Sequence, residues 1–448
     1  MSHQPLSLKE KLGYGLGDTA SNIVYQAVGN LLLYFYTDVY GIEAAAAGTL
    51  LLVVRVLDAF LDPMMGAVAD RTRTRHGRYR PWMLWVAVPY GLLAIAVFFT
   101  PNADVGTKLV YAYISYALMM AAYTAVNIPY SALGGVITAD PQERANVQTY
   151  RFAMAMLGGA LVTASVLPLV NLLGNGDREL GYTLAMTVMA LVAVLCFFGC
   201  FALTQERVPI NETTAKHSIW SDVLAMLANR QWQIIALATL FIMTRGAMQS
   251  AVKPYFVDYY LIKDNIPAFF ASTDTLISTF LTLTMLAGVG GALTAGVLVK
   301  KLCKVTVMRI AVTGTLTINL LLFLLPRDAV LLSLCLIMMA NFCHMIFVPM
   351  LFSTVPDTVD FGLKTYGKGA MGMFVAGHLL ALKIGNAFGQ AATGWLLTMT
   401  GYVPKAVQTE EALNGILFIY AGSSVVAAVL VLLCLQFYKL TKGWELRA

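Results

Sequence analysis

The stretch VRVLDAFLDPMMGAVADRTRTRHGRYRPW, residues 54–82, places acidic side chains inside an otherwise apolar segment. Asp58 and Asp62 lie in the middle of this segment, and five arginines separate it from the next apolar segment, which begins at Trp82. Ionisable residues within a membrane span are rare and face protein or water rather than lipid. The stretch therefore predicts a membrane-spanning helix that carries a charged inner face.

The whole chain has the composition of a membrane protein. Of its 448 residues, 58% are hydrophobic and 12% are charged, whereas soluble domains contain about 25% charged residues. The apolar residues form twelve continuous segments without strand-like alternation, which favours an all-α membrane protein with twelve transmembrane helices over a barrel. The segments are 18–40, 46–69, 82–100, 109–137, 148–173, 181–204, 233–260, 274–299, 306–326, 329–355, 370–400 and 412–438.

The longest polar gap divides these segments into two sets of six. We therefore predict an N-terminal six-helix bundle in residues 1–204, a central cytoplasmic loop in 205–232 and a C-terminal six-helix bundle in 233–448. The second and eighth segments end similarly, with GAVADR at 66–71 and GVLVKK at 296–301. Two related six-helix halves are typical of the major facilitator fold.

The Lys and Arg residues are distributed unequally between the two sides of the predicted membrane. Twenty fall on the side that holds both termini, and five fall on the other side. Cytoplasmic loops carry the excess of basic residues, so we predict cytoplasmic termini and a multi-pass protein of the cytoplasmic (inner) membrane. The net charge of +6 then reflects topology, and we expect no nucleic-acid binding. Arg245 and Lys253 are expected near a helix end, where basic side chains snorkel.

Three charged residues share one face of the second predicted helix. Arg55, Asp58 and Asp62 are spaced by three and four residues. Each charge at mid-membrane costs about 2.5–3.5 kcal/mol, so this face must turn away from lipid. Two interpretations remain open. The face forms a buried ion-pair network that locks the helix, or its paired carboxylates hold a small hard cation or share a proton.

Polar stripes on other predicted helices suit a sugar. Amides supply the donors and acceptors that hydroxyl groups need, and aromatic rings stack on sugar C–H faces. For any single amide, the alternative is a hydrogen bond between packed helices. The candidate sugar-binding residues are Asp18, Asn22, Gln26, Asn127, Ser131, Arg151, Lys383 and Asn386.

Several motifs together resemble one transporter family. They include KLGYGLGDTASN at 11–22, VRVLDAFLDPMMG at 54–66, RTRHGRYRPW at 73–82, YTAVNIPYSALGG at 123–135 and LKIGNAFGQ at 382–390. In combination they resemble the glycoside–pentoside–hexuronide:cation symporters, the melibiose permease family of the major facilitator superfamily, nearly end to end. The resemblance implies cation-coupled sugar import.

The resemblance also implies roles for individual residues. Asp58 and Asp62 would bind the coupling cation, with Thr124 as a further ligand. Asn22 and Asn127 match sugar-binding positions, and Arg151 and Lys383 match basic residues that line the same cavity.

The sequence departs from melibiose permease at positions that affect specificity. Leu61 stands between the two acids where that permease has Asn, which removes a neutral oxygen ligand. We therefore favour a proton over sodium as the coupling ion, carried on Asp58 or Asp62. Asn22 and Asn127 replace acids and Ser131 replaces a Trp, so galactoside specificity is not expected. Whether the cargo is a glycoside, a pentoside or a hexuronide stays open.

Alternating access is the expected transport mechanism. Sugar and cation bind near the midplane from outside, and neutralising the acids lowers the cost of enclosing them. A charged loop would latch the two halves together on the cytoplasmic side; the alternative for this loop is a role in orientation alone. The latch residues would be Asp70, Arg71, Arg78 and Arg80.

Other functional classes predict different features. An uncoupled sugar facilitator would not accumulate its cargo, and a carrier of a lipid or other amphipathic solute would have a more apolar cavity. An enzyme would need a nucleophile–base pair or a metal cluster, and the five histidines and six cysteines follow no such motif. We therefore predict no catalytic activity, no metal and no cofactor. By analogy with the fold, we expect a monomer whose partners are a small-molecule sugar and membrane lipid.

Overall fold

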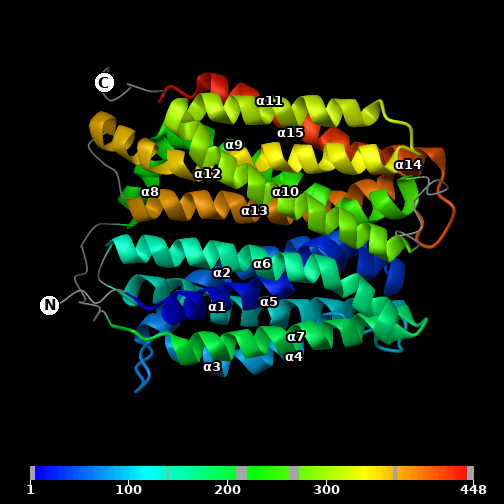
Figure 1. The fold of residues 1–448 in the computed structure, drawn as a ribbon, viewed down its shortest axis with the longest axis horizontal. Helices are drawn as coiled ribbons and strands as arrows, with labels where there is room; N and C mark the ends of the chain where they lie inside the picture. Colours follow the sequence, from blue (N-terminus) through cyan, green and yellow to red (C-terminus); the bar gives the residue numbers. More distant parts are fainter. Residues whose placement is uncertain (1–5, 139–140, 208–218, 262–271, 367–370, 441–448) are drawn as a thin grey trace. The chain divides into compact units, whose positions relative to one another are not determined.

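The computed structural model describes residues 6–138, 141–207, 219–261, 272–366 and 371–440. Helices make up nearly all of this described part (Figure 1). The chain forms two compact units, one of residues 1–213 with 277–279 and the other of residues 214–276 with 280–448.

The first unit contains seven described α-helices and one π-helical turn. In chain order they are α1 (Leu8–Tyr34), η1 (Phe35–Val39), α2 (Ala44–Arg71), α3 (Arg80–Trp85), α4 (Ala87–Val97), α5 (Val105–Val136), α6 (Pro141–Gly174) and α7 (Arg178–Leu203).

The second unit continues the helical pattern. Its described elements are α8 (Ile219–Ala228), α9 (Arg230–Tyr255), η2 (Phe256–Tyr260), α10 (Thr273–Lys301), α11 (Lys304–Phe323), α12 (Val330–Tyr366), α13 (Met371–Met399), α14 (Glu410–Leu417), η4 (Phe418–Gly422) and α15 (Ser423–Phe437).

Nine helical segments in the described part of the chain are long and apolar enough to cross a membrane. The helices α1 and α13, which carry two of the predicted polar stripes, are not among them, and α4 is a shorter apolar helix. The helical, membrane-type architecture is therefore confirmed, and the count of twelve spans stays a prediction.

At two places, the ends of a helix differ from the ends of the predicted apolar segment, and local chemistry explains each difference. The helix α1 begins ten residues before its apolar segment because Ser7 and Glu10 form a capping box, in which each side chain accepts a hydrogen bond from the backbone N–H of the other. The third apolar segment is split between α3 and α4 at Val86. Pro89 has no N–H and its ring crowds the carbonyl of Trp85, so the helix cannot continue through this point.

In each unit, a glycine lets two helices pack with their backbones in contact. A Cβ atom added to Gly158 of α6 would lie 2.9 Å from the carbonyl oxygen of Thr19 in α1. A Cβ atom added to Gly385 of α13 would lie 2.8 Å from the carbonyl oxygen of Leu240 in α9. Larger residues would hold these helices apart, so both glycines set the distance between helices that carry polar side chains.

The polar side chains beside these contacts follow one pattern in both units. In the first unit, Arg151 lies seven positions before Gly158, and its partner Asp18 directly precedes Thr19. In the second unit, His378 lies seven positions before Gly385, and its partner Thr239 directly precedes Leu240. Arg151 Nε lies 3.0 Å from Asp18 Oδ2, and His378 Nδ1 lies 3.2 Å from Thr239 Oγ1. The two units thus share a local packing arrangement, as related halves would.

We expect Gly158→Ala to destabilise the protein by about 1–3 kcal/mol, because the added methyl group overpacks the contact between α1 and α6. The matched control is Gly29→Ala, also in α1, where no atom lies within 4 Å of the added Cβ. That control should unfold at the same temperature or higher, since Ala favours a helix by about 1 kcal/mol over Gly. Thermal unfolding of the purified variants measures the difference. Equal midpoints for the two variants would refute the close packing.

Candidate functional site

Two acidic side chains of α2 meet one hydroxyl group of α5. Thr124 Oγ1 lies 2.5 Å from Oδ1 of Asp58 and 3.4 Å from Oδ1 of Asp62. A hydroxyl group has a single hydrogen to donate, so the short bond goes to Asp58. Asp58 is 3% exposed and Thr124 is 2% exposed. The spacing of four residues along α2 and the approach of α5 together bring two carboxylates to one neutral oxygen.

This arrangement is suited to a small positive ion. Two carboxylates in a low-dielectric interior repel each other, and a proton or cation bound between them removes that repulsion. Carboxylate and hydroxyl oxygens are also the hard ligands that small cations prefer. Among the residues that the structure describes, no group of three or more His, Cys, Asp and Glu side chains is placed to hold a metal ion.

Arg55, one turn before Asp58, contacts tyrosines. Its Nε donates a hydrogen bond to the Tyr116 hydroxyl at 3.1 Å, and its guanidinium carbon lies 5.0 Å from the centre of the Tyr25 ring. Its Nη2 is buried and has no hydrogen-bond partner among the described residues. The charge of Arg55 still attracts Asp58. The guanidinium therefore partly balances the acidic pair while its hydrogen bond goes to a tyrosine.

A pair of stacked tyrosines connects this cluster to α1. The rings of Tyr25 and Tyr123 are stacked, with centres 5.8 Å apart and an angle of 27° between their planes. Tyr123 interacts electrostatically with both Asp18 and Asp58. The tyrosine pair therefore lies between the two acidic groups of the first unit. Its half-buried rings offer an aromatic surface, whereas Ser131, at the position of the Trp in melibiose permease, offers none.

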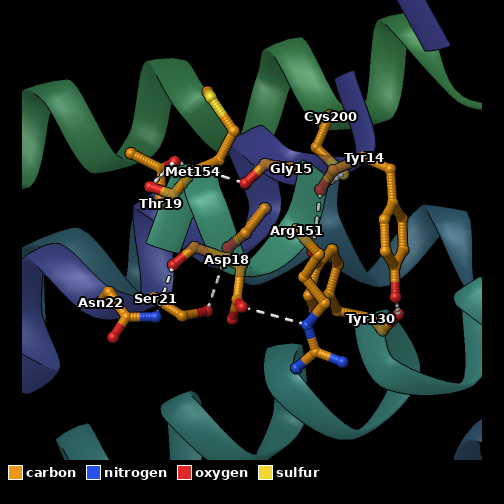
Figure 2. Close-up of polar contacts among 11 residues, drawn as sticks. Tyr14, Gly15, Asp18, Thr19, Ser21, Asn22, Tyr130, Arg151, Met154 and Cys200 are labelled. Atoms are coloured by element: carbon orange, nitrogen blue, oxygen red, sulfur yellow. Dashed lines mark hydrogen bonds and ion pairs between the residues drawn. The ribbon is translucent and has the colours of Figure 1, made fainter. Parts of the chain in front are cut away.

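Asp18 and Arg151 form an ion pair between α1 and α6 (Figure 2). Their side chains are 9% and 20% exposed. The Arg151 guanidinium lies 5.2 Å from the centre of the Tyr130 ring, which stacks on Tyr14 at 4.7 Å. Tyr130 also donates a hydrogen bond to the backbone oxygen of Tyr14 at 2.8 Å. Arg151 is thus held by one carboxylate and one aromatic face.

The remaining predicted polar residues of the first unit are less tightly bound. Asn22 donates from its amide nitrogen to the backbone oxygen of Asp18 at 2.9 Å, and the Gln26 side-chain oxygen accepts from Asn30 at 3.1 Å. Half-buried Asn127 and exposed Ser131 make no side-chain hydrogen bond within the described residues. Their polar groups are available to a ligand.

The loop predicted as a cytoplasmic latch is fixed to its own unit. The carboxylate of Glu206 accepts hydrogen bonds from the backbone N–H groups of Arg78, Tyr79 and Arg80 at 2.6–2.9 Å, at the start of α3. The Arg80 guanidinium donates to the backbone oxygen of Phe201 at 2.7 Å.

The other latch residues are less constrained. Arg71 is exposed, and the side chain of Asp70 lies outside the described residues. Next to this loop, Arg207 donates to Glu10. Partial burial raises the pKa of Glu10, but the hydrogen bonds from Arg207 and Ser7 outweigh burial and hold that pKa below its usual value.

The second unit contains a buried cation, Arg245, whose expected position at a snorkelling helix end is wrong. Arg245 is 1% exposed and does not snorkel. Its Nε donates to Ser424 of α15 at 3.1 Å and its Nη2 to the side-chain oxygen of Gln249 at 2.5 Å. Gln249 in turn donates to Asn319 of α11 at 3.2 Å. The signal in the sequence was the spacing of Arg245, Gln249 and Lys253 by four residues, which puts them on one face of α9.

Two predicted sugar-binding residues also belong to the second unit. Lys383 and Asn386 are half-buried in α13, and Asn386 makes no side-chain hydrogen bond within the described ranges. Gly385, between them, brings this part of α13 against α9.

Comparison with known proteins identifies the family. The family model described as MFS/sugar transport protein matches residues 13–442. The putative glycoside/cation symporter YagG of Escherichia coli is 37% identical over 437 residues, which are 97% of this chain and 93% of that protein. The isoprimeverose transporter of Lactiplantibacillus pentosus is 31% identical over 436 residues, which are 97% of this chain and 89% of that protein.

A solved transporter has the same fold. The crystal structure of the nucleoside transporter NupG matches with a TM-score of 0.63 and 14% identity, covering 96% of this chain and all of that one. The apolar helices and the bacterial relatives indicate a multi-pass protein of the inner membrane. The resemblance to the glycoside–pentoside–hexuronide:cation symporters is confirmed, and the chain belongs to the MFS/sugar transport protein family.

Proposed function

We propose that this protein is a symporter that couples the entry of one cation, a proton, to the import of a sugar. The observation that carries the proposal is the convergence of Asp58 and Asp62 on the Thr124 hydroxyl. A neutral buried site would suffice for a facilitator, whereas two adjacent carboxylates favour a bound positive charge. The names of the relatives, a glycoside/cation symporter and an isoprimeverose transporter, support the same reaction class.

The proton is favoured by the ligands that the site offers. Leu61 lies between the acids in α2 and supplies no side-chain oxygen. Sodium needs several oxygen ligands arranged around it, whereas a proton needs one carboxylate and a hydrogen-bond partner. Thr124 is such a partner. Asp58, with the shorter bond to Thr124, is the proposed carrier of the proton, and Asp62 supplies the second negative charge that makes the site attract it.

The sugar would bind where polar groups and aromatic surface meet. The stacked rings of Tyr25 and Tyr123 offer a surface for the C–H face of a sugar ring. The amides of Asn22 and Asn127 would bind hydroxyl groups, with Gln26, Ser131, Lys383 and Asn386 as further contacts. Because Asp18 and Arg151 already bind each other, their role would be to hold α1 against α6 beside the sugar.

The transport cycle rests on the predicted topology. Twelve spans, cytoplasmic termini and two six-helix bundles that rock about a central site would provide alternating access. Protonation of the acidic pair lowers the cost of closing the site around cargo, which couples the two fluxes. Asp70, Arg71, Arg78 and Arg80 would act at the cytoplasmic closure. The protein would act as a monomer in membrane lipid.

Proteoliposomes with separately imposed gradients test this proposal. An inward proton gradient without sodium should drive accumulation of a labelled glycoside, pentoside or hexuronide, and a protonophore should abolish it. Accumulation driven only by a sodium gradient would show that the coupling ion is sodium and not a proton. Equilibration without accumulation under every gradient would identify an uncoupled facilitator and contradict the proposal.

A further inference from the structure

The interior charges differ between the two units. In the first unit, the two carboxylates of Asp58 and Asp62 accompany a single cation, Arg55, and Asp18 is paired with Arg151, so negative charge is in excess within these two clusters. In the second unit, α9 carries two cations, Arg245 and Lys253, that repel each other. Neither forms an ion pair with a carboxylate among the described residues. The cluster at Asp58 and Asp62 suits a cation, and this face of α9 suits an anion.

Burial makes these unmatched cations significant. Arg245 is 1% exposed, its Nη1 is buried without a hydrogen-bond partner in the described part of the chain, and Lys253 is half-buried. Removing a charge from water is costly unless an opposite charge compensates it. The other two nitrogens of the Arg245 guanidinium donate to Ser424 and Gln249, which are both neutral. Among the described residues, no carboxylate pairs with Arg245 or Lys253 to neutralise this face of α9.

Lys253 is the accessible end of this positive stripe. Its Nζ donates a hydrogen bond to Thr284 Oγ1 of α10 at 3.0 Å, and Asn341 of α12 donates to the backbone oxygen of Thr284 at 2.6 Å. Three helices thus meet at Thr284, the partner of Lys253. An ammonium group has three hydrogens to donate, and only one is used by a described partner. Two donors remain for the oxygens of an anionic ligand.

We propose that Lys253 binds a carboxylate of the cargo, so that the transported sugar is a hexuronide rather than a neutral glycoside. This inference rests on the proposed function and specifies its substrate. Arg245, two turns before Lys253 on the same face of α9, raises the positive potential without touching the cargo. Arg151 cannot take this role while Asp18 holds it.

The position of Lys253 agrees with an import route. Under the proposed topology it lies near the extracellular end of α9, two residues before that helix ends at Tyr255. An incoming anion would meet Lys253 early, and the positive potential would raise the local concentration of acidic sugars over neutral ones. The hydrogen bond to Thr284 already restrains the lysine side chain, which reduces the entropy lost when the carboxylate binds.

Two sugars that differ only at C6 test the inference. Methyl β-glucoside and methyl β-glucuronide are titrated against the purified protein by calorimetry in a neutral detergent. The wild type should bind the glucuronide more tightly, by roughly tenfold or more, because a hydrogen bond to a charged group is stronger than one to a hydroxyl. Lys253→Gln should lose this preference and keep its affinity for the glucoside. Lys253→Arg should retain the preference, and Lys405→Gln, which removes an exposed basic charge, should behave as wild type.

Each remaining outcome has a distinct meaning. Equal affinity of the wild type for both sugars, or an equal loss of both in Lys253→Gln, would overturn this inference and leave the proposed function standing. Binding of neither sugar would contradict the proposed function and this inference with it. If the preference disappears in nanodiscs containing phosphatidylglycerol, the site binds a lipid phosphate, and the inference about cargo is wrong.

Discussion

Asp58→Asn is expected to abolish gradient-driven accumulation of sugar while leaving the protein folded. Asn has the same shape, and its side-chain oxygen can still accept the hydrogen bond from Thr124, but it cannot carry a transported charge. One charge moving through 100 mV supplies about 2.3 kcal/mol, which corresponds to roughly fifty-fold accumulation. The variant should reach equal concentrations inside and outside. Steady-state uptake of labelled cargo in energised vesicles measures this ratio.

The control for this prediction is Asp104→Asn. Asp104 is exposed at the start of α5, where its side chain accepts a hydrogen bond from the backbone N–H of Thr107 at 3.1 Å. Asn also caps helices well, so this variant should accumulate sugar like the wild type. Exchange of labelled for unlabelled sugar should survive in Asp58→Asn, because exchange needs binding and reorientation without net ion movement. Undiminished accumulation in Asp58→Asn would show that Asp58 does not carry the coupling ion.

Asp58→Asn also separates the two interpretations of the charged face of α2. If the face were an ion-pair network that locks the helix, removal of the Asp58 charge would lower thermal stability and exchange together. If it is a coupling site, stability should stay the same or rise, because one of two repelling carboxylates has been neutralised. A thermal unfolding scan beside each transport measurement distinguishes these results.

Breaking the Asp18–Arg151 ion pair on one side is expected to destabilise the protein strongly. Asp18→Asn or Arg151→Gln alone leaves an unpaired charge in a largely buried position. We expect a loss of about 3 kcal/mol for each, at the lower end of the range for buried pairs, because Arg151 is 20% exposed. The double variant leaves no unpaired charge and should recover most of that loss. Unfolding of the purified variants gives the coupling energy.

A second ion pair provides the matched control. Arg327 lies 2.7 Å from Glu410, and the two side chains are 24% and 75% exposed. Solvent screens such a pair, so Arg327→Gln and Glu410→Gln should each leave the unfolding midpoint almost unchanged. If the double variant of Asp18 and Arg151 loses as much stability as the two single losses combined, the residues act independently and the ion pair is not what holds α1 to α6.

Periodicity alone was enough to predict one part of the candidate site. The spacing of Asp58 and Asp62 by four residues requires a shared helix face, and the cost of a charge in lipid requires that face to turn inward. The fold class followed from composition and from the continuous apolar segments. Thr124, by contrast, came only from the family resemblance, because nothing in its local sequence shows which helix α5 approaches.

The parts that were missed depend on contacts between distant residues. Asp18 and Arg151 were both predicted to bind sugar, but they are 133 positions apart, and their pairing is set by the close approach of Gly158 to Thr19. Arg245 was expected to snorkel because, together with Lys253, it was placed near a helix end. In its buried position Arg245 donates a hydrogen bond to Ser424, which is 179 positions away in the sequence. The sequence around Arg245 does not reveal a partner at that separation.

The central claim is that a cation bound at Asp58 and Asp62 moves together with the sugar. The most direct measurement is the pH outside de-energised vesicles in a weak buffer when sugar is added. The account predicts a rise in external pH with the wild type, as protons enter with the sugar, and no change with Asp58→Asn. Sugar entry accompanied by neither a pH change nor uptake of labelled sodium would contradict it.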